Sequence, residues 1–329
     1  MKLLVLSRNR FLYSSRRLVK AGRLRGHEVE VANPLAAHVT VHARSPISFH
    51  EPDSTIQPAV DLVMPRIGYS ITDYGLAIVR QYEMMGIPVL NRAEAIGRAR
   101  DKVHALQALV SAGLPIPPTV LMRSAAHVEA AVDAVGGLPV VVKTFKGTQG
   151  VGVMLLNSLA SLRSILDMMG SMGQDILMQR FIQEASGRDV RVFVVGGKAV
   201  AAMRRESDGE EEFRSNLHRG GKGEAVDLDP QFERVAQRAV AALGLDIAGV
   251  DILETSAGPM IVEVNAAPGL EGIEGATQVD VADAMIEHGE QLVAQATTRT
   301  ADHEPSPVAS AIEPPLAAPL ASSFRALHD

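Results

Sequence analysis

"IAGVDILETSAGPMIVEVNA", residues 247–266, joins two β-rich runs, IAGVDILE (247–254) and PMIVEVNA (259–266), across the turn TSAGP. On a strand, side chains two residues apart point to the same face, so Glu263 and Asn265 project together. If the two strands pair antiparallel across the turn, Asp251 lies on that face as well. This stretch therefore predicts an antiparallel sheet with a cluster of polar groups on one face.

The polar cluster has the composition of a site for a hard cation. Asp251, Glu263 and Asn265 offer three oxygen donors, two of them anionic, in a chain that contains no cysteine. Such a set suits Mg²⁺ that bridges substrate phosphates. The alternative is three satisfied polar side chains at the end of a sheet. Two acidic groups that converge on one face within apolar strands favour the interpretation as a metal site.

The rest of the chain divides into segments of different character. Residues 1–95 alternate apolar runs such as KLLVLS (2–7) with helical patterns such as SRRLVKAGRLRGH (15–27), which predicts a small parallel sheet with helices on its faces. The later β-runs favour an antiparallel arrangement, so the expected class is α+β with at least two domains. The boundaries that we expect are 1–95, 96–178, 179–297 and 298–329. The last segment is rich in Ala, Pro and Ser, which predicts a disordered tail.

Composition restricts the classes of protein to which the chain can belong. The chain has 329 residues, of which 47% are hydrophobic and 21% charged, as in globular proteins. No apolar run approaches the roughly 20 residues of a transmembrane helix. The opening MKLLVLSRNR is too short in apolar residues for a signal peptide, and the absence of cysteine fits a cytoplasmic location. A net charge of −6 argues against direct nucleic-acid binding.

A glycine loop separates two further β-runs. In PVVVKTFKGTQGVGVMLL the strand ends at Lys143 and the loop KGTQGVG covers residues 146–152. Strand, loop and strand suggest an antiparallel hairpin. The loop matches neither a Walker phosphate loop nor a dinucleotide fingerprint. It could lie over a nucleotide and present backbone N–H groups to phosphates, or it could be an ordinary turn. Lys143 favours the first reading, because a charge after an apolar run is costly without an anionic partner; an exposed strand end is its alternative.

A second polar stretch is EFRSNLHRGGKGEA, residues 212–225, which follows the acidic run ESDGEEE (206–212). A site that binds phosphate or carboxylate oxygens and lets the backbone approach them closely needs arginines beside a Gly-Gly. The alternative is a loop that these side chains merely fix by hydrogen bonding.

These motifs together resemble one family. Lys102 in RARDK, KGTQGVGV, QRFIQEASGRDVRVFVVG, FRSNLHRGG, AGVDIL and VEVNAAPGLEGIE occur in the order found in ATP-grasp ligases. The chain looks like the RimK type, which adds glutamate to the C-terminus of a small-subunit ribosomal protein. The resemblance covers roughly residues 1–290 and includes PRIG and RQYEMMG. It implies an ATP-grasp fold, with a pre-ATP-grasp domain at 1–95, a central subdomain at 96–178 and a metal-bearing subdomain at 179–297.

The resemblance also implies roles for single residues. Lys102 and Lys143 would contact ATP phosphates, and the loop would close over them. Asp189 would accept from the ribose hydroxyls, and Asp251, Glu263 and Asn265 would bind two Mg²⁺ or Mn²⁺ ions. Arg214 and Asn216 would act with Lys143 on the reacting phosphoryl group. Arg180, Phe181 and Ile182 would hold adenine through their backbone. The ATP contacts would further include Gly147, Thr148, Gln149, Gly150 and Ser215, and the substrate contacts Arg204, His218 and Arg219.

The chain departs from the family pattern in three places. Arg180 stands where an acidic residue is usual, and Ala267 replaces a usual serine. The acidic run 206–212 also looks longer than usual. None of these departures removes a phosphate or metal group.

The implied activity is an ATP-dependent carboxylate–amine ligase that acts through an acyl phosphate. Its partners would be free L-glutamate and the C-terminus of an acceptor protein, and the family suggests a homotetramer. One alternative keeps the chemistry but uses an amino-acid carrier protein, a cofactor tail or a small peptide as the acceptor. An alternative of another class is a nucleotide-binding regulatory protein without turnover. The intact Asp251, Glu263, Asn265, Lys102 and Lys143 argue against this last possibility.

Overall fold

The computed structural model describes residues 1–302, apart from 40–46, 52–53, 57–58, 145–151 and 208–221. The chain forms two compact units, Met1–Val293 and Ala294–Asp329. Within the described part, the second unit contains only the end of the last helix, α9 (Val281–Asp302), which runs past residue 298, where the tail is expected to begin. The tail from residue 303 lies outside the described residues.

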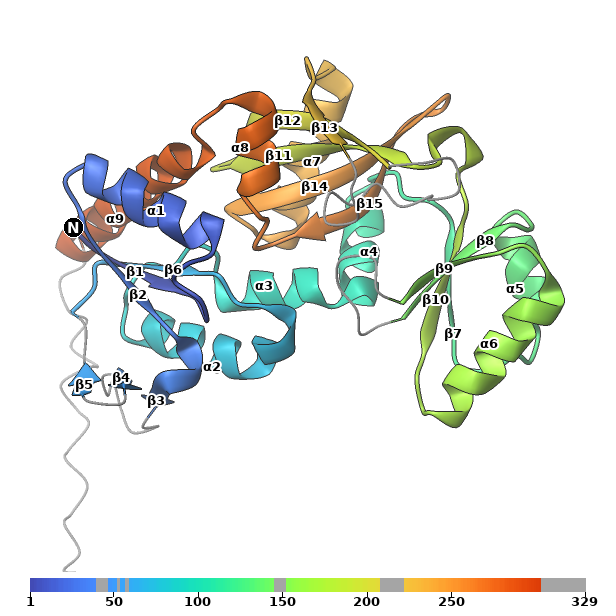
Figure 1. The fold of residues 1–329 in the computed structure, drawn as a ribbon, viewed down its shortest axis with the longest axis horizontal. Helices are drawn as coiled ribbons and strands as arrows, with labels where there is room; N and C mark the ends of the chain where they lie inside the picture. The colour runs from blue at the N-terminus through green and yellow to red at the C-terminus, as the bar shows by residue number, and fades with distance from the viewer. Residues whose placement is uncertain (40–46, 52–53, 57–58, 145–151, 208–221, 303–329) are drawn as a thin grey trace, which may run out of the picture. The chain divides into compact units, whose positions relative to one another are not determined.

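The first unit begins with a three-stranded parallel sheet (Figure 1). Its order is β2 (Glu28–Ala32), β1 (Lys2–Leu6), β6 (Leu62–Pro65). All four residues of β6 are buried, which is why the strand reads as a continuous apolar run. Helix α1 (Tyr13–Leu24) follows β1, and α2 (Thr72–Met84) follows β6. The βαβ arrangement predicted for this segment is confirmed.

Short elements complete the first 111 residues. A small antiparallel sheet lies between β2 and β6, and two helices meet end to end after α2. The elements are η1 (Pro34–Ala36), β3 (Ala37–Val39), β4 (Ile47–Glu51), β5 (Ser54–Ile56), η2 (Tyr69–Ile71), α3 (Ala93–Arg100) and α4 (Lys102–Ser111). Asp101 separates α3 from α4 and caps α4, because its carboxylate accepts from the N–H groups of Val103 and His104.

The central sheet has the order β7 (Thr119–Met122), β10 (Ile176–Arg180), β8 (Val140–Thr144), β9 (Val153–Leu156). Strands β8 and β9 pair antiparallel, so the hairpin predicted around the glycine loop is confirmed. Helices α5 (Val128–Ala134) and α6 (Leu159–Ser171) share an apolar core with Val140 and Val142 of β8 (Figure 1). Because side chains alternate along a strand, Lys143 lies on the opposite face of this sheet.

The largest sheet has five antiparallel strands in the order β13 (Lys222–Ala225), β12 (Lys198–Glu206), β11 (Arg188–Val195), β14 (Ile247–Thr255), β15 (Gly258–Asn265). Helix α7 (Pro230–Leu243) buries Val235 and Ala239 in one core cluster with Val250. Residues of β14 that alternate with Val250, such as Asp251, therefore lie on the face away from α7. The remaining elements are η3 (Gln183–Ala185) and α8 (Glu271–Thr277).

The apolar core joins the first and last parts of the chain. Leu4 of β1 and Val264 of β15 belong to one cluster, and Leu3 of β1 shares another with Phe193 of β11 and Ile273 of α8. Only the central sheet has a separate cluster. The proposed metal-bearing strands therefore rest on apolar packing that the N-terminal sheet shares. No helix in the described ranges has the length and apolar character needed to cross a bilayer.

Candidate active site

The predicted metal ligands share one face of the large sheet. Asp251 pairs directly with Glu263 across the β14–β15 ladder, and Asn265 pairs with Gly249, two residues before Asp251. The antiparallel pairing expected from the sequence is therefore confirmed, and it places all three side chains on the face away from α7. Their role as metal ligands stays a prediction.

Asp251 is enclosed by two arginines. The Nε and Nη2 atoms of Arg191, on the neighbouring strand β11, donate to Asp251 Oδ1 and Oδ2, both at 2.7 Å. Arg205 Nη2 of β12 lies 2.9 Å from Asp251 Oδ2. Burial raises the pKa of Asp251, but the guanidiniums of Arg191 and Arg205 outweigh burial and hold it at about 2. Asp251 is thus ionised at neutral pH and fixed in position.

Asp189, expected at the ribose, belongs to the same network. Its carboxylate accepts from Arg205 Nε at 2.7 Å and Nη2 at 2.5 Å, and Asp189 and Arg205 are both buried. A ribose hydroxyl would have to share this carboxylate with Arg205. The contact to ribose stays a prediction.

The donor set fits a hard divalent cation. Glu263 is exposed and makes no hydrogen bond or ion pair with another described residue. Asn265 Oδ1 accepts only from the N–H of Ala267, at 3.0 Å. Among the described residues, Asp251 Oδ1 accepts from Arg191 alone and keeps a lone pair, whereas Oδ2 contacts both Arg191 and Arg205. Within the described ranges no group of three or more His, Cys, Asp or Glu residues could hold a metal, so two carboxylates and an amide are what this face offers Mg²⁺.

Two lysines face the same carboxylates. Lys143 Nζ donates to Gln179 Oε1 at 2.7 Å, and Gln179 Nε2 donates to Thr119 Oγ1 at 2.9 Å, so a neutral amide holds the ammonium. Burial lowers the pKa of Lys143 to about 8, partly offset by the negative charge of Glu263. Burial also lowers the pKa of Lys102, the first residue of α4, and Glu263 again opposes the shift. Both lysines therefore lie within electrostatic reach of Glu263.

Two arginines that we assigned no role from the sequence lie within electrostatic reach of each other, and one of them, Arg100, also of Lys102. Arg66 follows β6 and donates to the carbonyl of Pro268 at 2.5 Å. Arg100 ends α3 and donates to the carbonyl of Ile67 at 2.6 Å. The sequence signal for them is slight: Arg66 stands directly after a buried strand in PRIG, and Arg100 lies two residues before Lys102.

Other predicted residues lie elsewhere. Arg204 of β12 forms a two-point ion pair with Glu254 at 2.9 Å. It alternates with Arg205, so it lies on the opposite face of the sheet from Asp251. The structure therefore does not bring Arg204 together with the other candidate residues, although its role in substrate binding is not tested.

The predicted adenine segment lies at the end of β10. Arg180 is exposed, and its N–H donates to the carbonyl of Pro118 at 2.9 Å, so this N–H already has a partner. The backbone contacts of Arg180, Phe181 and Ile182 to adenine stay a prediction. The remaining predicted residues lie outside the described part of the chain: Gly147, Thr148, Gln149, Gly150, Arg214, Ser215, Asn216, His218 and Arg219.

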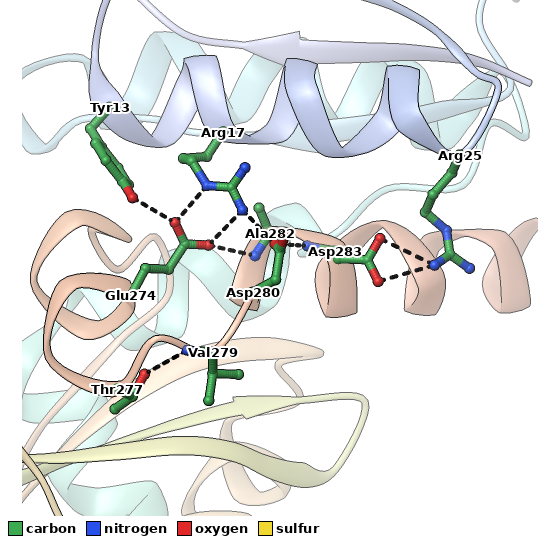
Figure 2. Close-up of polar contacts among 9 residues, drawn as sticks. All are labelled: Tyr13, Arg17, Arg25, Glu274, Thr277, Val279, Asp280, Ala282 and Asp283. Atoms are coloured by element: carbon green, nitrogen blue, oxygen red, sulfur yellow. Dashed lines mark hydrogen bonds and ion pairs between the residues drawn. The ribbon is translucent and has the colours of Figure 1, made fainter.

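The motif that follows Asn265 is anchored from outside the site. Buried Glu274 of α8 accepts hydrogen bonds from Tyr13 Oη at 2.9 Å and Arg17 Nε at 2.7 Å, both of α1, and from the N–H of Ala282 at 3.0 Å (Figure 2). Arg17 also contacts Asp280. This acidic residue of NAAPGLEGIE therefore fastens α8 to α1 and is not directed at the metal face.

Asn91 is a second anchor that sequence reasoning missed. Its Nδ2 donates to the carbonyls of Ile247 and Ala266 at 2.7 and 2.9 Å, and its Oδ1 accepts from the N–H groups of Asp246 and Ile247 at 2.7 and 2.8 Å. The side chain is buried and fully hydrogen-bonded. It ties the start of β14 to the end of β15, which fixes the two strands that carry Asp251 and Asn265.

Comparisons with known proteins identify the family and the fold. A family profile described as the RimK-like ATP-grasp domain matches residues 99–288, and one described as the RimK PreATP-grasp domain matches residues 1–96. The chain is 45% identical over 300 residues to a probable alpha-L-glutamate ligase of Ectopseudomonas mendocina (strain ymp), which covers 91% of this chain and 99% of the relative.

Solved structures show the same fold. The RimK domain protein ATP-grasp from Sphaerobacter thermophilus DSM 20745 superimposes with a TM-score of 0.66 at 22% identity, over 88% of this chain and 99% of that one. The ATP-grasp ligase PsnB, complexed with minimal precursor, Mg and ADP, gives a TM-score of 0.67 at 20% identity, over 90% and 98% of the two chains. These likenesses establish the ATP-grasp architecture expected from the sequence motifs.

Proposed function

The chain belongs to the RimK-like ATP-grasp family, and on this premise we propose that it joins L-glutamate to a carboxylate of a peptide or protein. Family membership makes the protein an ATP-dependent ligase that forms C–N bonds. The curated relatives carry the name probable alpha-L-glutamate ligase, and this supports glutamate as the amine substrate. ATP and Mg²⁺ are the cofactors that the family and its Mg–ADP complex support.

One observation carries the proposal. Glu263 faces two lysines whose pKa values burial lowers, Lys102 and Lys143, beside the Asp251 carboxylate. Partly buried ammonium groups gain from an anionic partner, and ATP phosphates supply one. Two carboxylates and an amide beside them supply oxygen ligands for the ion that accompanies ATP. This is the combination that phosphoryl transfer to a carboxylate requires.

The proposed reaction has two steps. A carboxylate oxygen of the acceptor attacks the γ-phosphorus of ATP, and the bond from this phosphorus to the β,γ-bridging oxygen breaks. ADP departs, and the acceptor is now an acyl phosphate. The amine of glutamate then attacks the acyl carbon, inorganic phosphate leaves with its electron pair, and the amine loses a proton. Lys143 and Lys102 orient the phosphates, and Arg214 and Asn216 are proposed to contact the phosphoryl group in transit. Asp251, Glu263 and Asn265 would hold the divalent ion, which would neutralise part of the phosphate charge when bound.

The finer identities belong to the proposal too. We propose that two ions bind, either Mg²⁺ or Mn²⁺, and that the acceptor is the C-terminus of a small-subunit ribosomal protein. This acceptor implies a cytoplasmic enzyme. We further propose that the enzyme is a homotetramer. What supports the acceptor is the resemblance in FRSNLHRGG and NAAPGLEGIE. A small peptide is the second candidate, because the solved PsnB and MdnC structures hold precursor peptides.

The experiment compares acceptors directly. The purified chain is incubated with Mg–ATP and isotope-labelled L-glutamate, either with ribosomal proteins or with synthetic peptides that end in glutamate, and the products are analysed by mass spectrometry. We expect labelled glutamyl residues to be added to a C-terminus with release of ADP, and we expect no addition with Glu263→Gln. Incorporation of another amino acid in place of glutamate, or ADP release without any adduct, would contradict the proposal.

A further inference from the structure

Arg66 occupies an unusual position for a cation. It follows β6 at the carboxyl end of the parallel sheet, and its N–H donates to the carbonyl of Leu6 at 2.8 Å. Its guanidinium donates through Nη2 to the carbonyls of Pro268 and Ala267, at 2.5 and 3.5 Å. Nε and Nη1 have no partner among the described residues. They are not among the buried unpaired atoms, so they remain within reach of solvent.

Arg100 lies beside Arg66 and is also incompletely bonded. Its Nη2 donates to the carbonyl of Ile67, the residue after Arg66. Its Nε is buried without a hydrogen-bond partner in the described part of the chain. Burial and, to a smaller extent, the charge of Arg100 together lower the pKa of Arg66 to about 10. Burial lowers the pKa of Arg100 as well, which Glu263 partly offsets.

The energetic contrast with the other enclosed arginines is informative. Arg205, Arg191 and Arg17 each form short ion pairs with carboxylates. Arg66 and Arg100 form no ion pair with a described carboxylate, although they are neighbours of like charge. Neutral carbonyls compensate a guanidinium less than an anion does, and the buried, unpaired Nε of Arg100 adds a further cost. Because this pair of adjacent arginines keeps an uncompensated positive charge, an anion that binds between them would be stabilised.

We propose that Arg66 and Arg100 form the recognition site for a carboxylate of free L-glutamate, an inference that rests on the proposed ligase function. Two guanidiniums present planar donor pairs that match a carboxylate. Arg66 contacts the Ala267–Pro268 segment that follows Asn265, and Arg100 lies within electrostatic reach of Lys102 and Glu263. A glutamate held there lies next to the phosphate-binding lysines and the proposed metal face.

The chemistry of the reaction favours glutamate over the acceptor. The acceptor carboxylate loses its charge when it is phosphorylated, so two fixed guanidiniums would stabilise its reactant form and oppose the step. Neither carboxylate of the incoming glutamate reacts, so a permanent ion pair costs nothing during turnover. The phosphates of ATP already have Lys102 and Lys143 as proposed cationic partners. A fixed cationic pair is therefore best matched to a carboxylate that stays charged throughout.

The test uses Arg66→Met and Arg100→Met, which keep an aliphatic stem, with Arg98→Met as the matched control. Arg98 lies on the same helix as Arg100 and also has a buried Nε without a partner in the described part of the chain, but it forms an ion pair with the exposed Glu94 at 2.7 Å. We expect the KM for glutamate to rise roughly 10- to 100-fold in both test variants, as the loss of a charged hydrogen bond implies. The KM for ATP should stay within about twofold of the wild-type value, and the control should match the wild type.

Hydroxylamine in place of glutamate separates the possible failures. It has no carboxylate, so the test variants should form the acyl hydroxamate at the wild-type rate. Equal losses of hydroxamate and amide would show that the arginines serve the acceptor or ATP, and an unchanged KM for glutamate would also overturn the inference. A wild-type enzyme that forms neither product would contradict the proposed function itself.

A binding measurement covers variants that fold poorly. The affinity of L-glutamate for the full chain is measured by calorimetry with Mg–ADP present, for the wild type, Arg66→Lys and Arg100→Lys, after thermal melts have been recorded. Lysine keeps the charge but loses the planar donor pair, so we expect weaker binding in both variants. Wild-type affinity for L-glutamate in the folded lysine variants would overturn the inference.

Discussion

Asp251 and Glu263 share a proposed role, but they differ in their surroundings. Asp251 is buried and holds both Arg191 and Arg205, whereas Glu263 is exposed and makes no ion pair with a described residue. Loss of the Asp251 charge would leave two enclosed guanidiniums with less compensation. The contribution to metal binding and the contribution to folding can therefore be separated by comparing the two residues.

We expect Glu263→Gln and Asp251→Asn both to abolish ligation, because each removes a charged oxygen ligand. Only Asp251→Asn should also lower the free energy of unfolding, by about 3 kcal/mol, since it breaks a buried ion pair. The measurements are ADP release at ordinary Mg²⁺ concentrations and denaturant unfolding. Wild-type turnover in Glu263→Gln would remove the metal assignment, and equal stability of the two variants would contradict the network around Asp251.

Lys143 predicts a pH dependence of nucleotide binding. Its pKa of about 8 lies below the ordinary 10.5, so burial of the charged form destabilises the fold below pH 8 and this cost is relieved between pH 8 and 10.5. Phosphates favour the charged ammonium, so ATP should bind with uptake of a proton above pH 8. Calorimetry in buffers of different ionisation enthalpy measures this uptake.

Lys143→Met is the control for that measurement. The variant should bind ATP more weakly and take up fewer protons at pH 9, and Lys102 accounts for any uptake that remains. Identical proton uptake in the wild type and in Lys143→Met would place Lys143 away from the phosphates.

At the scale of elements, the sequence predicted what is local. The β14–β15 hairpin and the β8–β9 hairpin join strands close in sequence, so both pairings could be predicted, and the alternation of side chains was enough to place Glu263 and Asn265 on one face. The anchors of these elements are not local. Asn91 bonds to residues 155 to 175 positions away, and Glu274 bonds to α1 across more than 250 positions. No spacing rule on one strand or helix indicates such partners.

Glu274 provides a test at this scale. Glu274→Gln should lower the free energy of unfolding by about 1–3 kcal/mol, because an amide replaces the charge opposite Arg17 and the acceptor of Tyr13. The folded variant should keep wild-type affinity for Mg–ATP, because Glu274 lies with α1 and not on the metal face. Thermal melts and nucleotide titrations measure the two effects. A variant with normal stability but without ligation would give Glu274 a role in catalysis.

At the scale of the whole molecule, the family follows from motifs spread over most of the chain, and the fold agrees with it. Sequence motifs alone did not find Arg66 and Arg100, because their setting is created by packing between β6, α3 and the segment after β15. Sequence also placed Arg204 with the substrate contacts, without the strand register that sets it on the other face. The roles predicted for residues 147–150 and 214–219 remain predictions.

The central claim is that this ligase activates a carboxylate by phosphorylation, and one isotope measurement tests it most directly. The acceptor carboxylate is labelled with ¹⁸O, and the inorganic phosphate formed with Mg–ATP and L-glutamate is analysed by mass spectrometry. An acyl phosphate transfers one carboxylate oxygen to phosphate, so we predict one ¹⁸O per phosphate released with the amide. Amide formation accompanied by unlabelled phosphate would contradict the account.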